Sequence, residues 1–70
     1  MISFDPLWRT LKAKGLNKGE LQKLTGMSSS TIAKLSKNEV VKLDVVDRIC
    51  QELKVPIYDV VEIIQDPALK

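Results

Sequence analysis

Hydroxyl and amino groups gather in one short stretch of the sequence. The set comprises Lys18, Ser28, Ser29, Ser30, Thr31, Lys34 and Lys37. Hydroxyl and ammonium groups donate hydrogen bonds to phosphate oxygens, and a lysine can also donate to guanine O6 or N7. Because serine and threonine have little reach, they favour contacts with a nucleic-acid backbone over two-pronged base contacts. Lys34 is therefore the best candidate for reading a base, with ordinary surface exposure as its alternative.

The same residue types give little support to catalysis. The chain has no histidine, and its one cysteine, Cys50, falls within an apolar helical pattern that predicts a small core residue. Thr31 stands three residues before Lys34, a spacing that some nucleophilic enzymes use, but on a helix face expected to meet solvent. No metal-ligand or phosphate-loop spacing is present. We therefore expect no enzyme activity, no catalytic residue, no metal and no cofactor.

Charge is divided unevenly along the chain. Residues 1–37 contain seven basic and two acidic side chains, a net charge of +5, whereas residues 38–70 contain four basic and seven acidic ones, a net charge of −3. This division suggests that the first half faces a polyanion, although ordinary solvated helix faces would also explain it. Seventy residues fit one domain, 1–70, and no apolar run has the length of a membrane helix. With no signal-peptide layout at the N-terminus, we expect a cytoplasmic protein that does not enter a membrane.

Capping residues place the hydroxyl and lysine groups on helices. Asn17 and Glu20 have the spacing of a capping box, Gly26 ends the helix that follows, and Ser28 is a favoured cap for the next one. Only Met27 separates the last two, which is too short a turn for a relaxed hairpin. The pattern predicts helices at about 6–14, 18–25, 28–37, 43–53 and 57–62. In detail, Asp5 would cap the first helix, while Gly15 and Asn38 would adopt left-handed conformations.

Apolar spacing predicts which helix faces are buried. The expected core positions are Leu7, Leu11, Leu21, Leu24, Ile32, Leu35, Leu43, Val46, Ile49, Cys50, Leu53, Ile57, Val60 and Val61. Residues 1–4 could form an arm, a short strand or a lid. The sequence therefore predicts an all-α fold, a compact five-helix bundle with a helix-turn-helix at 18–37. An ordinary helical hairpin is the alternative.

The order of residues across this corner resembles a known family. Its motif residues are Leu16, Asn17, Glu20, Leu21, Gly26, Met27, Ser28, Ile32, Lys34 and Leu35. They look like the Cro and phage-repressor (XRE-like) helix-turn-helix family, and within it a group of very small single-domain bacterial regulators. The resemblance implies a lambda-repressor-like domain whose third helix enters the DNA major groove.

Position by position, the resemblance also implies roles. Lys18 takes the place of a residue, often glutamine, that contacts phosphate or a base edge. Ser28, Ser29, Ser30, Thr31 and Lys34 occupy recognition-helix positions that face DNA, and Lys37 is expected to contact phosphate. Three positions depart from the commoner pattern: Gln22 stands for a usual alanine, Ser36 for glutamate and Asn38 for glycine.

These observations predict a transcriptional regulator, a repressor that occupies a double-stranded DNA operator. Regulators of this size commonly pair to read two half-sites, so we expect a homodimer. The apolar tail offers the candidate pairing residues Val60, Val61, Ile63 and Ile64, which could equally pack on the protein's own core. The rival class is a protein-interaction module, an antitoxin, antirepressor or adaptor that uses its acidic second half.

Overall fold

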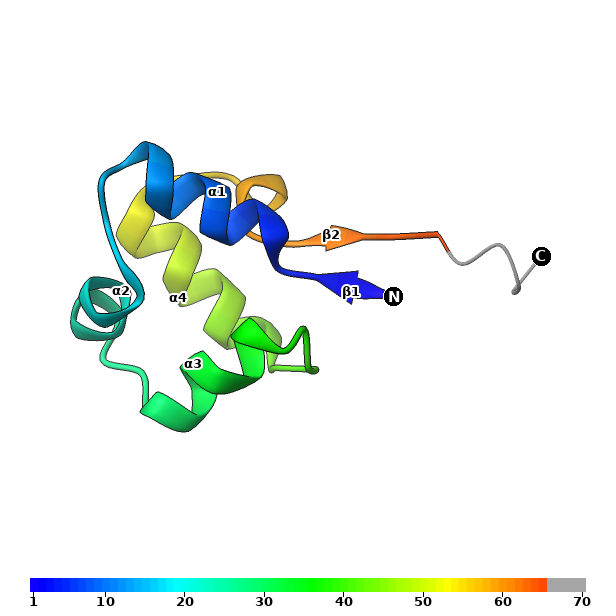
Figure 1. Ribbon diagram of the computed structural model, residues 1–70, viewed down its shortest axis with the longest axis horizontal. Helices are drawn as coiled ribbons and strands as arrows, with labels where there is room; N and C mark the ends of the chain where they lie inside the picture. The colour runs from blue at the N-terminus through cyan, green and yellow to red at the C-terminus, as the bar shows by residue number, and fades with distance from the viewer. Residues whose placement is uncertain (66–70) are drawn as a thin grey trace.

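The computed structural model describes residues 1–65 and arranges them as a group of α-helices with a small β-sheet at one end (Figure 1). The elements are β1 (Ile2–Ser3), α1 (Asp5–Ala13), α2 (Lys18–Thr25), α3 (Ser29–Ser36), α4 (Leu43–Leu53), the 3₁₀ turn η1 (Ile57–Asp59) and β2 (Glu62–Ile63). Within the described part of the chain there are therefore four α-helices, which makes the expected five-helix bundle wrong in its last element.

The corner between α2 and α3 has the predicted caps. The Asn17 side chain accepts a hydrogen bond from the Glu20 amide at 2.8 Å, and the Glu20 carboxylate accepts one from the Asn17 amide at 3.1 Å. Gly26 has φ 70°, in the left-handed region, and the Ser28 hydroxyl accepts from the Thr31 amide at 3.3 Å. These local bonds satisfy helix-end amides that would otherwise lack partners, so they fix where each helix begins.

The start of α1 differs from the prediction. The helix begins at Asp5 and not after it, and Phe4 is the capping residue without a side-chain cap bond. The Ser3 hydroxyl instead accepts from the Asp5 amide at 3.2 Å. The serine two positions before the aspartate thus supplies a side-chain acceptor in place of the one that the aspartate was expected to supply.

The core lies between the helices and includes side chains from every one of them. Its buried members are Phe4, Leu7, Leu11, Leu21, Ile32, Leu35, Val46, Ile49, Leu53 and Val60. Three predicted core residues are wrong, because Leu24 is 45% exposed, Leu43 is 77% exposed and Ile57 is 53% exposed. Thr25, four residues after Leu21, is buried instead, and its hydroxyl donates to the Leu21 carbonyl at 2.8 Å. Cys50 is half-buried against this core.

The predicted helix at 57–62 does not form. After η1 the chain is extended, and β2 pairs antiparallel with β1, with Ile2 opposite Ile63. The Thr10 hydroxyl donates to the Asp59 carbonyl at 2.6 Å, which occupies an acceptor that a continuing helix would use. The β-branched residues that follow favour extended backbone. Of the three structures that the sequence left open for residues 1–4, the short strand is the one that forms.

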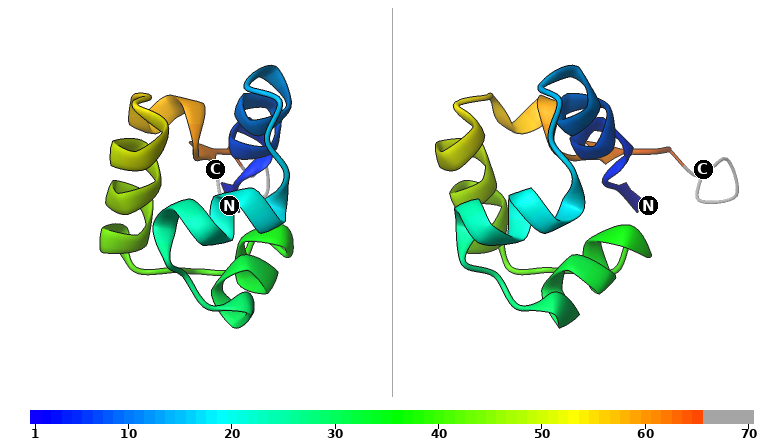
Figure 2. Two further views of the ribbon diagram at one scale, coloured as in Figure 1. Left: turned by 90° about the vertical axis from the view of Figure 1, so that its left-hand side faces the viewer. Right: turned by 60° about the vertical axis from the view of Figure 1, so that its left-hand side comes forward.

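Two long-range contacts hold the ends of α2 and α3. Arg48 of α4 donates from Nη1 to the carbonyl of Thr25, at the end of α2, at 3.0 Å. Asn38, which follows α3, has φ 56°, and its side-chain oxygen accepts from the Phe4 amide at 2.8 Å. Both views of Figure 2 show α3 at the lower edge of the molecule, with one side turned away from the other helices.

Candidate nucleic-acid interface

Helix α3 has one buried side and one exposed side. Ile32 is 9% exposed and Leu35 is fully buried, so these two residues anchor the helix to the core. The exposed residues of the helix and its C-terminal cap are Ser29, Ser30, Ala33, Lys34, Ser36 and Lys37, while Thr31 is half-buried. The outward side chains are therefore small, polar and basic. Because most of them are short, the backbone of the helix could come close to the base edges in a DNA groove.

The hydroxyls at the start of α3 form a connected group. The Ser28 hydroxyl lies 2.9 Å from that of Ser30 and 3.1 Å from that of Thr31, in addition to accepting from the Thr31 amide. Among residues 1–65, the Ser29 hydroxyl has no hydrogen-bond partner. The structure thus brings these four predicted site residues together. It gives Ser28 first of all a capping role, and it leaves Ser29 the most available for an outside acceptor.

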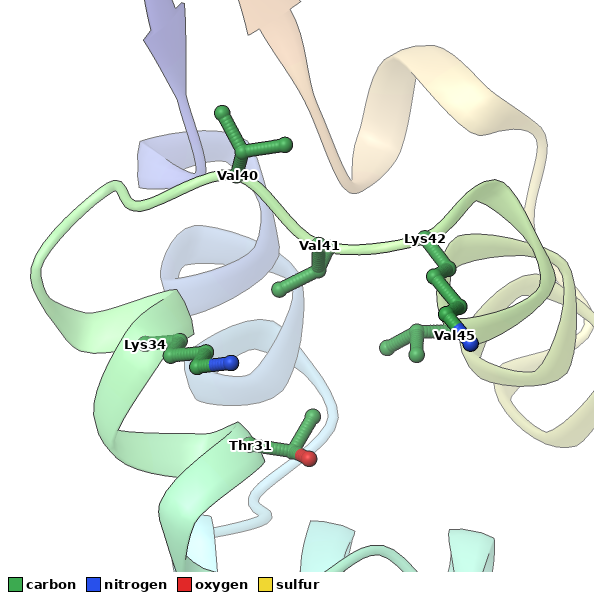
Figure 3. A pocket seen from close by; sticks show the side chains of 6 residues that line it. All are labelled: Thr31, Lys34, Val40, Val41, Lys42 and Val45. Atoms are coloured by element: carbon green, nitrogen blue, oxygen red, sulfur yellow. The ribbon is translucent and has the colours of Figure 1, made fainter.

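A groove runs between α3 and the start of α4 (Figure 3). Thr31, Lys34, Val41 and Val45 point toward the space between the two helices, while Val40 points away from it. Lys42, immediately before α4, lines the same groove. Lys42 was not among the candidate site residues predicted from the sequence, although a basic residue shortly after the predicted recognition helix was the available signal. The groove carries positive charge on both sides.

Lys18 lies apart from the cluster of hydroxyls at the start of α3, and its side chain contacts two neighbours. Its ammonium donates to the Ser36 hydroxyl at 2.9 Å and lies 4.6 Å from the centroid of the Trp8 ring. Neither neighbour was a predicted site residue, since neither position carries a signal for this contact in the sequence. Lys37, at the end of α3, is exposed.

Two other features of residues 1–65 bear on catalysis and metal binding, namely the Cys50 thiol and the placement of possible metal ligands. Burial raises the pKa of the Cys50 thiol, and the nearby carboxylates of Asp47 and Asp59 raise it further. A thiol with a raised pKa is a poor nucleophile at neutral pH, because less of it is thiolate. Within residues 1–65, no three His, Cys, Asp or Glu side chains are grouped to hold a metal ion. In the same residues, every helix is too short or too polar to cross a membrane.

Helices α2 and α3 meet at a short capped turn. Apolar residues anchor α3 to the core, and its exposed side is basic. This combination defines a helix-turn-helix DNA-binding domain. The chain belongs to the Cro/C1-type helix-turn-helix DNA-binding domain family, whose sequence model matches residues 6–66. This match confirms the resemblance seen in the motif residues.

A solved structure extends the comparison to the whole fold. The chain is similar to the crystal structure of transcriptional regulator VanUg, Form II, with a TM-score of 0.88 and 40% sequence identity. The match covers 93% of this chain and 87% of the other. A comparison with curated protein sequences gives no match.

Proposed function

We propose that residues 1–70 act as one DNA-binding domain, a transcriptional regulator that represses by occupying a double-stranded operator in the cytoplasm. Helix α3 enters the major groove. The observation that carries this proposal is the division of α3 into an anchored side, with Ile32 and Leu35, and an exposed small and basic side. The likeness to VanUg, which is described as a transcriptional regulator, supports the same class at 40% identity.

The hydroxyl and lysine side chains at residues 28–42 have proposed roles. Ser29 and Ser30 donate to phosphate oxygens near the start of α3, and their small size brings the helix close to the bases. Lys34 reads a base edge, because its flexible stem can extend from the groove beside α4. Lys37 and Lys42 neutralise phosphates and so contribute affinity that depends on salt. Ser28 and Thr31 complete the cluster of hydroxyls that contacts the DNA backbone.

The DNA proposal is tested by measuring affinity for selected duplexes at several salt concentrations. Binding should weaken steeply as salt rises, and Lys18→Ala with Lys34→Ala should weaken it about tenfold or more. Lys54→Gln is the matched control, since Lys54 ends α4 on the side of the molecule away from α3 (Figure 1). Unchanged affinity in the double variant would contradict the site. An absence of binding at low salt would favour the protein-interaction class.

We also propose that the protein pairs as a homodimer with two-fold symmetry. The structure corrects the candidate surface, because Val60 is fully buried in the protein's own core and Val61 is half-buried. Ile63 and Ile64 remain, 66% and 42% exposed, and exposed Tyr58 of η1 lines the same pocket as Ile63. In the described sheet β2 has one open edge, and the same edge of a second copy is its natural complement.

Solution mass measured by sedimentation tests this pairing. Ile63→Asp should give a monomer, whereas Leu24→Asp, which charges an exposed leucine on α2, should leave the mass unchanged. Selection from a random duplex pool should return sites with two-fold symmetry. A monomeric wild-type protein on a single asymmetric site would refute the dimer.

A further inference from the structure

One hydrogen bond closes the open end of the helix-turn-helix. The short turn at 26–28 joins the end of α2 to the start of α3. At the opposite ends, Lys18 is the first residue of α2 and Ser36 is the last residue of α3. The Lys18 ammonium donates to the Ser36 hydroxyl at 2.9 Å, so the two helices are tied at both ends.

The bond is part of a directed chain that involves three helices. The Ser36 hydroxyl donates to the Ile32 carbonyl at 3.1 Å, which turns its oxygen lone pairs toward the lysine. The ring of Trp8, on α1, lies 4.6 Å from the ammonium nitrogen, within the range of a cation–π interaction. An ammonium has three N–H groups. With one given to Ser36 and one side against the ring, a further N–H still faces solvent.

Helix dipoles favour this placement of the ammonium. A lysine in the first turn of a helix meets the partial positive charge of that terminus, which is unfavourable. The Lys18 side chain instead carries its charge to the end of α3, where the partial charge is negative. The contact therefore moves the positive charge away from the positive end of α2 and toward the negative end of α3. This explains why a basic residue is tolerated at the start of α2.

We propose that Lys18 is a positioning residue, a brace that fixes the angle between α2 and α3 before DNA is bound. The inference rests on the proposed function, since it concerns the pose in which α3 meets the groove. It differs from a plain phosphate contact in one respect. A brace depends on Ser36 and Trp8, whereas a phosphate contact depends on the charge of Lys18 alone.

A double-variant cycle without DNA tests the brace directly. Lys18→Met and Ser36→Ala should each raise the unfolding equilibrium constant about two- to fivefold in urea, and the double variant should be little worse than Lys18→Met alone. Trp8 is the one tryptophan of the chain, so its emission should change in both single variants. Lys23→Met, on the same helix, is the control and should be additive with Ser36→Ala. Additive effects for Lys18 and Ser36 would overturn the inference.

Operator affinity supplies the second readout. Ser36→Ala removes no charge, so a braced α3 predicts about threefold weaker binding with an unchanged salt slope, and recovery in Ser36→Thr, which keeps the hydroxyl. Wild-type affinity in Ser36→Ala would overturn the brace while leaving the proposed function intact. If the wild-type protein bound no DNA, the proposed function would fail, and the urea cycle would still decide whether the brace exists.

Discussion

Replacing Asn38 with glycine, the residue usual at this position in the family pattern, should destabilise the protein. Asn38 has φ 56°, where glycine is free of strain, so backbone geometry alone predicts a gain. The side chain, however, accepts from the amide of Phe4, a residue 2% exposed, at 2.8 Å. Glycine would leave that amide without its partner.

The two effects can be weighed. Leaving a buried donor unsatisfied costs about 1–3 kcal/mol. Asparagine tolerates the left-handed region well, so the relief of strain in Asn38→Gly is small, and it is offset by the roughly 0.5–1 kcal/mol that glycine's freedom in the unfolded chain costs. We expect a net loss of about 1–3 kcal/mol for Asn38→Gly. Asn38→Ala should lose more, about 2–5 kcal/mol, because alanine adds about 1–2 kcal/mol of left-handed strain.

Urea unfolding and thermal melting measure these values. In a domain of this size, about 1 kcal/mol moves the melting temperature by about 4–8 °C. Lys54 is the matched control, because it has φ 57° at the end of α4 and makes no side-chain hydrogen bond within residues 1–65. Lys54→Gly should leave stability unchanged or raise it by up to about 1 kcal/mol. If Asn38→Gly were as stable as the wild-type protein, the role assigned to the Phe4 contact would be wrong.

Three further predictions concern the core, the cap and the thiol. Leu35→Ala should cost about 2–5 kcal/mol in urea unfolding, whereas Leu24→Ala, at an exposed site, should cost under about 1 kcal/mol. Asn17→Ala should cost about 1 kcal/mol and lower the helical circular dichroism signal, because the Glu20 amide loses its acceptor. At pH 8 Cys50 should react with iodoacetamide more slowly than in urea, because burial raises its pKa. That shift keeps the thiol protonated, so stability should fall only as the pH rises above the unfolded thiol's pKa.

The sequence predicted those features that depend on neighbouring residues. The capping box at Asn17, the left-handed Gly26 and the Ser28 cap each involve groups within four residues of one another, so their spacing can be recognised directly. The division of α3 followed in the same way from the three-residue step between Ile32 and Leu35. The roles of the site residues on DNA stay a prediction.

Features set by distant contacts could not be read from spacing. Leu24 and Thr25 both follow Leu21 at helical steps, and only the packing of α4 against α2, with Arg48 at the end of α2, decides that Thr25 is the buried one. At 57–62 the apolar pattern suited a helix, but pairing with β1 and the Thr10 hydroxyl favour a turn and a strand. Both errors arose where a partner far along the chain outweighs local preference.

The two departures at the end of α3 illustrate the same rule and lead to opposite expectations. Ser36 replaces a usual glutamate and accepts a hydrogen bond from the Lys18 ammonium. Asn38 replaces a usual glycine and accepts a hydrogen bond from the Phe4 amide. Changing Ser36 to glutamate keeps an acceptor near Lys18 and should be close to neutral, since an exposed ion pair contributes about 0–1 kcal/mol. Changing Asn38 to glycine leaves no side-chain acceptor. Because both changes move toward the commoner pattern, resemblance to the family cannot explain different outcomes, whereas the contacts with Phe4 and with Lys18 can.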